Sequence, residues 1–212
     1  PRVAASGTGR TGFAPNWKLA LGAMMLSTAS GGFIFGAMTF VVPRYFEISM
    51  TSISTSVAIT GLLASLVYAT ASFTQIGVGW LIDRFSPKWV LFSLGLGQIL
   101  FIFLAAQYTD YALFFAMLVA MSFVFGQIPI TDTILSRYVP DEWRAKALSV
   151  KFMLNLTIGA TVLPICGVIL QSGSPMSSLF TLMSAVAIVV ALSGLMLPQQ
   201  ADDQRRDMMP AE

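Results

Sequence analysis

Six long apolar stretches run through this 212-residue chain, and short polar intervals separate them. A helix needs about 20 apolar residues to cross the hydrocarbon core of a bilayer. The strands of a membrane barrel would instead alternate polar and apolar residues over about 10 positions, and these stretches do not alternate. The sequence therefore predicts an all-α bundle of six transmembrane helices. The predicted spans are residues 19–42, 57–82, 90–107, 112–135, 147–170 and 176–197.

The composition supports a membrane protein and argues against several kinds of site. Charged residues make up 10% of the chain, against about 25% in soluble domains, and hydrophobic residues make up 56%. The chain has no histidine and one cysteine, Cys166, so a zinc or haem site is not expected. We also find no constellation of catalytic residue types. We therefore predict no catalytic residue, no metal, no cofactor, no enzyme activity and no nucleic-acid partner.

The basic residues are distributed unevenly between the two sides of the predicted bundle. With the N-terminus in the cytoplasm, Arg44 is the one basic residue on the far side. The other eleven fall on the cytoplasmic side: Arg2, Arg10, Lys18, Arg84, Lys88, Arg137, Arg144, Lys146, Lys151, Arg205 and Arg206. Since Lys and Arg are enriched in cytoplasmic loops, both termini are predicted to be cytoplasmic.

The predicted domain organisation follows from these spans. Residues 1–17 form a cytoplasmic linker, residues 18–198 the transmembrane domain and residues 199–212 a cytoplasmic tail. The chain starts at Pro1 rather than at a methionine, and its first residues are polar. We therefore expect it to be part of a longer protein.

The loop between the second and third spans carries a recognisable motif. Residues 79–88 read Gly-Trp-Leu-Ile-Asp-Arg-Phe-Ser-Pro-Lys. This loop resembles the signature Gly-x-Leu-x-Asp-Arg-x-Gly-Arg-Lys of the major facilitator superfamily, which lies at the same place in a six-helix half. The matching residues are Gly79, Leu81, Asp83, Arg84 and Lys88. Ser86 replaces the loop glycine, and Pro87 is a second departure.

The loop between the fourth and fifth spans supports the same resemblance. Residues 137–144 read Arg-Tyr-Val-Pro-Asp-Glu-Trp-Arg and are similar to the equivalent loop of facilitator transporters. Asp141 and Glu142 precede the fifth span, where acidic side chains favour the positive end of a helix dipole.

The resemblance implies one half of a twelve-helix transporter, built from two three-helix inverted repeats. The amino-terminal half of such transporters usually carries an arginine near the start of its fourth helix. The fourth span of this chain has none there, so we expect the carboxy-terminal half. The implied function is secondary active transport of a small organic solute by alternating access, with or without a coupled proton or ion. Its partners would be the lipid bilayer and the other six-helix half, in a bacterial cytoplasmic (inner) membrane. The alternative is a non-transporting scaffold or receptor-like subunit, for which a charged loop of this kind has no evident use.

The resemblance also implies a conformational latch formed by the two cytoplasmic loops. Its expected members are Gly79, Asp83, Arg84, Lys88, Arg137 and Arg144. Asp83 would pair with Arg137 or a helix N-terminus in one access state, and Gly77 and Gly79 would admit a neighbouring helix. The alternative is that Asp83 and Arg84 simply mark a solvated helix end.

Polar side chains inside the spans are the candidates for a substrate site. In the superfamily, spans one, two, four and five line the cavity, whereas three and six face outward. The candidates on the lining spans are Gln75, Gln127, Thr131, Lys151 and Asn155. Polar groups in membranes also serve as hydrogen bonds between helices, and that alternative stays open for each. Gln98, in the third span, fits an outward-facing helix less well.

Two charged residues near the cytoplasmic side have competing interpretations. We expect Lys151 to extend toward the interface, and the alternative is that it pairs with an anion in the cavity. Asp132 is five residues before Arg137, so we expect a structural pairing with a cytoplasmic base. The alternative for Asp132 is a proton relay.

Overall fold

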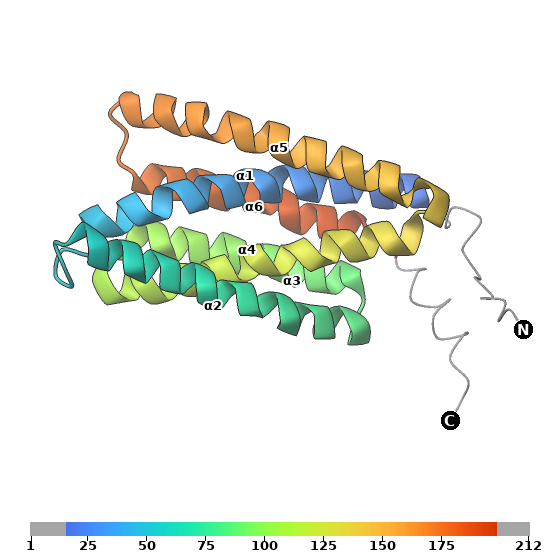
Figure 1. The fold of residues 1–212 in the computed structure, drawn as a ribbon, viewed down its shortest axis with the longest axis horizontal. Helices are drawn as coiled ribbons and strands as arrows, with labels where there is room; N and C mark the ends of the chain where they lie inside the picture. Colours follow the sequence, from blue (N-terminus) through green and yellow to red (C-terminus); the bar gives the residue numbers. More distant parts are fainter. Residues whose placement is uncertain (1–15, 199–212) are drawn as a thin grey trace, which may run out of the picture.

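The computed structural model describes residues 16–198, which form six long helices joined by short loops (Figure 1). The helices are α1 (Trp17–Ser49), α2 (Val57–Arg84), α3 (Pro87–Gln107), α4 (Asp110–Tyr138), α5 (Asp141–Gln171) and α6 (Ser177–Met196). All six are long and apolar enough to cross a membrane. The predicted all-α fold is confirmed, and residues 16–198 contain no strand. The predicted tail and nearly all of the predicted linker lie outside these residues.

Several helices extend beyond the predicted spans into the charged intervals. α5 begins at Asp141, so the acidic pair Asp141 and Glu142 lies in its first turn and offsets the positive end of the helix dipole. α3 begins at Pro87, which suits a first helical position because its missing N–H would be unpaired there. After α5 the chain turns at Gly173, whose φ of 80° favours glycine.

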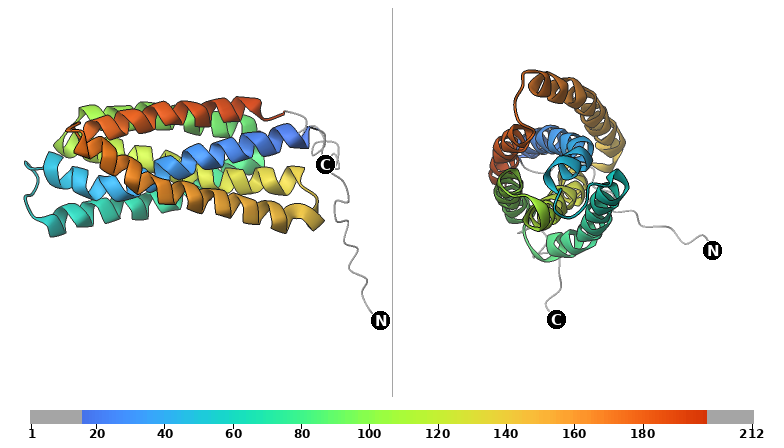
Figure 2. Two further views of the ribbon diagram at one scale, coloured as in Figure 1. Left: turned by 90° about the horizontal axis from the view of Figure 1, so that it is seen from above. Right: turned by 90° about the vertical axis from the view of Figure 1, so that its left-hand side faces the viewer.

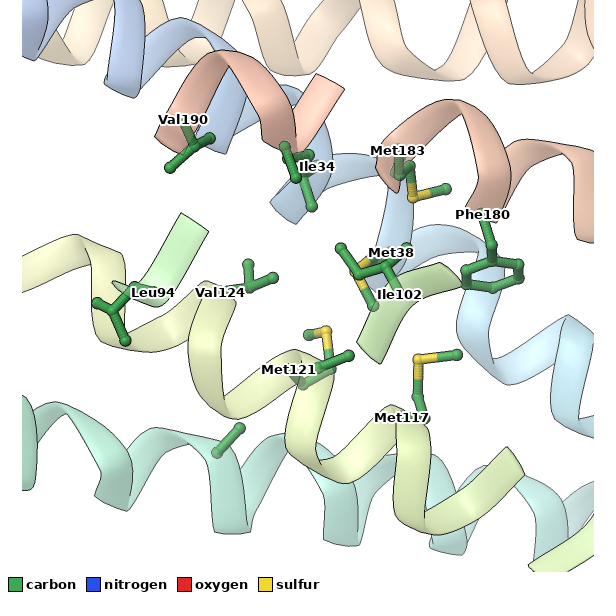
Figure 3. Packing of buried hydrophobic residues seen from close by; sticks show 14 of the residues in the cluster. Ile34, Met38, Leu94, Ile102, Met117, Met121, Val124, Phe180, Met183 and Val190 are labelled. Atoms are coloured by element: carbon green, nitrogen blue, oxygen red, sulfur yellow. The ribbon is translucent and has the colours of Figure 1, made fainter. Parts of the chain in front are cut away.

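The core lies where α1, α3, α4 and α6 meet (Figure 3). Met38 of α1, Met117 and Met121 of α4 and Met183 of α6 are fully or almost fully buried there. The unbranched, flexible side chain of methionine fills irregular gaps between helices. These four methionines therefore serve helix packing within this unit.

Glycines bring α3 and α6 into close contact. A Cβ at Gly95 would lie 2.6 Å from the backbone nitrogen of Ala191, and one at Gly194 would lie 2.8 Å from that of Phe92. Small residues at such crossings let helix backbones approach, which favours association in lipid. α3 and α6 are thus central packing elements.

α2 and α5 lie at opposite edges of the bundle in Figure 1, and the right-hand view of Figure 2 shows that α5 projects farthest from it. In their most apolar stretches 22% of α2 and 11% of α5 is buried, against 44% to 50% in the other four helices.

α6 is among the well-buried helices, with 50% of its most apolar stretch buried. The prediction that the sixth span faces outward is therefore wrong for one side of α6. Val190 is fully buried in the core, whereas Ile188 and Leu192 are exposed.

The described basic residues gather mainly at one end of the bundle. The starts of α1, α3 and α5 and the ends of α2 and α4 meet there (Figure 1). They carry Lys18, Arg84, Lys88, Arg137, Arg144 and Lys146. At the same end the Tyr138 hydroxyl donates a hydrogen bond to the carbonyl of Pro198. At the opposite end Asp110 accepts a hydrogen bond from the backbone N–H of Ser52, which holds the α1–α2 loop against α4.

Candidate functional site

A cavity of about 200 Å³ opens between α1, α4 and α5. Its lining combines apolar side chains with a group of polar ones. The lining residues are Ser27, Thr28, Gly31, Gly32, Phe35, Val124, Gln127, Ile128, Thr131, Asp132, Lys151, Phe152 and Asn155. Four of the five predicted substrate residues are thus brought together: Gln127, Thr131, Lys151 and Asn155.

The cavity extends from near the middle of the helices that form it toward their basic end, since Asn155 is about halfway along α5 whereas Lys151 is about 15 Å from its start. Ser27 and Gly32 are about 15 and 22 Å from the start of α1, which is about 50 Å long at 1.5 Å per residue. Since the hydrocarbon core is about 30 Å thick, the cavity falls well inside the membrane. Binding sites of secondary transporters lie near this depth.

Two adjacent glycines of α1 make room for the amide side chains. A Cβ at Gly31 would lie 2.8 Å from Cδ of Gln127, and one at Gly32 would lie 2.5 Å from Oδ1 of Asn155. Gly36, one turn further along, likewise receives Val162 of α5, 3.3 Å from an added Cβ. The Gly32-x-x-x-Gly36 spacing therefore marks a close contact between α1 and α5.

Gln127 belongs to a buried hydrogen-bond network between three helices. Its Nε2 donates to the carbonyl of Ser27 at 2.8 Å and to the Ser27 hydroxyl at 2.7 Å. Its Oε1 accepts from Nε2 of Gln98 at 3.0 Å. Both ends of the Gln127 amide are used, so in this structure it holds helices together. Gln98 is fully buried, so the expectation that the third span faces outward is wrong at this residue.

Lys151 and Asp132 form an ion pair across the cavity wall. Nζ of Lys151 lies 2.5 Å from Oδ1 of Asp132, and the exposed fractions of the two side chains are 10% and 54%. The expectation that Lys151 extends to the interface is wrong, because the side chain is buried inside the bundle against a carboxylate. The structural pairing expected for Asp132 is present, and its partner is Lys151, one of the basic residues that the sequence places on the cytoplasmic side.

Two other polar groups of the lining have no hydrogen-bond partner within residues 16–198. The Thr28 hydroxyl is buried and unpaired, and the Asn155 amide faces the same cavity. Thr131 instead donates to the carbonyl of Ile128 in its own turn. The sequence interpretation missed Thr28, although the cluster of Ser, Thr and Gly at residues 27–32 is visible in the sequence.

Gln75 is the predicted substrate residue that the structure leaves out of the cavity. It lies on α2, at the other edge of the bundle from α5 (Figure 2), and its side chain is partly exposed.

The sequence of residues 19–207 matches the family model of the Major Facilitator Superfamily. The chain belongs to this superfamily. It is therefore an integral, multi-pass membrane protein. A search of curated proteins finds no match for the chain.

Solved structures of the Major Facilitator Superfamily share this fold. One is a single-residue variant of the Escherichia coli fucose:proton symporter FucP, with a TM-score of 0.70 and 15% identity, covering 88% of this chain and 44% of FucP. Another is FucP in the outward conformation, also with a TM-score of 0.70 and 15% identity, covering 87% of this chain and 43% of that one. The chain thus spans somewhat less than half the length of these transporters.

The signature loop of the superfamily meets α4 in this structure through a backbone contact. Nη2 of Arg137 donates to the carbonyl of Ile82, 3.1 Å away near the end of α2. This carbonyl is at the negative end of the α2 dipole, where a guanidinium is favoured. Within residues 16–198 no ion pair joins Asp83 to Arg137, and Asp83 is exposed.

The other expected latch residues make local contacts. The Arg84 guanidinium lies 4.1 Å from the centre of the Trp80 ring. Arg144 pairs with Asp141 at 2.6 Å and donates to the carbonyl of Ser136. Lys88 is partly exposed in the first turn of α3. The expectation that Gly77 and Gly79 receive a neighbouring helix is wrong for helices α1 to α6, since no atom lies within 4 Å of an added Cβ at either residue.

Proposed function

We propose that this chain is one six-helix half of a secondary transporter for a small organic solute, and that the cavity between α1, α4 and α5 forms part of its solute site. The observation that carries the proposal is a partly polar cavity inside the membrane whose lining includes a buried ammonium group. Ionisable residues at such depth are costly, and they mark solute or ion pathways in membrane proteins. Alternating access would expose the cavity to each side in turn.

The other half of the transporter is the proposed partner of α2 and α5. These two helices bury little of their surface within this unit. Added Cβ atoms at Gly77 and Gly79 of α2, and at Gly159 and Gly167 of α5, would meet no atom within 4 Å. Glycine-bearing faces favour close helix association in membranes. We therefore assign these faces to a second six-helix unit, with this chain as the carboxy-terminal half.

We also propose that the two cytoplasmic loops act as a conformational latch. The contact from Arg137 to the end of α2 supports this role, because it links the signature loop to a helix that lines the cavity. Asp83, exposed beside that contact, would find its partner in another access state. Arg84, Lys88, Arg144 and Gly79 complete the proposed latch.

Cysteine accessibility in the full-length transporter tests the solute site. In a Cys166→Ser background, single cysteines at Thr28 and Asn155 should react with a small water-soluble thiol reagent, and the reaction should block transport. Cysteines at the exposed positions Ile188 and Leu192 of α6 are the matched controls and should stay unreactive because lipid covers them. Unreactive cysteines at both cavity positions in a transporter that still moves its solute would place the site elsewhere. Labelling without any transport activity would favour the scaffold alternative.

A further inference from the structure

We propose that the solute carries a carboxylate, and that Asp132 substitutes for this carboxylate on Lys151 whenever the cavity is empty. The inference rests on the proposed transport function and names the class of solute for the same cavity.

Lys151 needs an anionic partner in every state in which it stays buried. Its side chain is 10% exposed, and its partner in this structure is Asp132. Among the described residues that line the cavity, these two are the ones with ionisable charge. Removing one member of a buried ion pair leaves an uncompensated charge, which is strongly unfavourable. When the Asp132 carboxylate moves away from Lys151, another anion must therefore take its place.

Asp132 can leave this pair more easily than Lys151 can. Its side chain is 54% exposed within this unit and borders the cavity, so its carboxylate can turn away from Lys151 without displacing a packed side chain. The two residues also lie on different helices, and α4 makes few other contacts with α5. A solute anion can therefore exchange with Asp132 without disrupting the core.

The polar groups of the cavity that have no hydrogen-bond partner can bind a carboxylate. The Thr28 hydroxyl and the Asn155 amide both supply hydrogen-bond donors, and neither has a partner within residues 16–198. Carboxylate oxygens accept several such bonds, and bonds to a charged acceptor are stronger than neutral ones. Phe35 and Phe152 give the remainder of the solute an apolar surface.

This exchange of partners predicts how the carrier moves when it is empty. With Asp132 on Lys151, the empty carrier has no unpaired buried charge and can return across the membrane. An Asp132→Asn carrier would have to return with solute bound. Solute exchange should therefore persist in that variant while net transport is lost.

The first test is chemical rescue in the purified full-length transporter. Asp132→Asn should lower the melting temperature, and propionate should restore it while propionamide should not. The matched control is Glu47→Gln, which removes the partly exposed ion pair between Glu47 and Arg44 of α1, outside the cavity. It should show little change and no rescue. Lys151→Met together with Asp132→Asn should abolish the response to propionate. The proposal would be overturned if propionate and propionamide changed the melting temperature of Asp132→Asn equally, or if neither restored it. Restoration by inorganic phosphate or putrescine in place of propionate would also overturn it.

The second test compares exchange with net uptake in proteoliposomes. Radiolabelled lactate and succinate are the probes, and lactamide and succinamide are the neutral competitors. In Asp132→Asn the ratio of exchange to net uptake should rise about tenfold or more, whereas Lys146→Met, a change at an exposed base of the same helix as Lys151, should leave it unchanged. Equal loss of both activities would contradict the role given to Asp132. Transport of neutral solutes with no dependence on Lys151 would remove the carboxylate inference and leave the proposed transport function standing.

Discussion

Gly31 and Gly32 are adjacent in α1, yet they face neighbours of different mobility. Gly31 faces Gln127, whose amide is held at both ends by Ser27 and Gln98. Gly32 faces Asn155, whose side chain is exposed and without a hydrogen bond in the described part of the chain. The same added methyl group therefore meets a fixed side chain at one position and a mobile one at the next.

We predict that Gly31→Ala destabilises the protein by about 1–3 kcal/mol, because the Gln127 network cannot move aside without losing hydrogen bonds. Gly32→Ala is the matched control, and its cost should be smaller since the Asn155 side chain can rotate away. Unfolding of the two full-length variants, measured by tryptophan fluorescence in detergent, compares them directly. Equal destabilisation would show that Gln127 is not held as firmly as its contacts indicate.

At the level of the helices, α2 compensates for a proline in α1. Pro43 has no N–H, so the carbonyl of Thr39 loses its usual partner within the helix. The Tyr68 hydroxyl of α2 donates to this carbonyl at 3.2 Å and also lies 3.4 Å from that of Met38. One side chain thus satisfies the backbone that the proline leaves open, and it joins the two helices.

Tyr68→Phe should therefore cost about 0.6 kcal/mol in free energy of unfolding, and at most about 1.7 kcal/mol, which are the average and the maximum measured for hydrogen bonds between membrane helices. In a Pro43→Ala background the cost should be smaller, because the restored N–H at residue 43 can bond to the Thr39 carbonyl. Unfolding free energies of the wild type, both single variants and the double variant give this coupling. A cost of Tyr68→Phe that is independent of residue 43 would contradict the compensation.

For the whole molecule, the distribution of charge makes a prediction about orientation. The end of the bundle with Lys18, Arg84 and Arg137 should face the cytoplasm, because basic residues are retained on that side. In a Cys166→Ser background, a cysteine at Thr51 should react with a membrane-impermeant reagent added to intact cells. A cysteine at Ser86 should react only after the membrane is opened. The reverse pattern would invert the topology.

The number and type of helices could be predicted from the sequence because lipid leaves the backbone few alternatives. In the hydrocarbon core each N–H and C=O must be paired within the protein, so a long apolar stretch becomes a helix. The loop at residues 79–88 also indicates the superfamily through its residue types and their spacing alone. The predicted span limits are too short at several ends, since hydropathy stops at the first charged residue while the helix continues, as α5 does at Asp141.

The partners of the polar residues were decided by the tertiary structure. Gln127 and Ser27 are 100 residues apart in the chain, and Lys151 and Asp132 are on different helices. Neither contact can be predicted from the spacing of its two residues in the sequence. Hydropathy places Lys151 near the cytoplasmic side. Arg144 lies only seven residues earlier on the same helix, so the sequence favours an interfacial position for the Lys151 side chain. The packing of α5 against α1 instead buries Lys151 beside Asp132 of α4. The energy of a charge inside a membrane depends on which groups surround it.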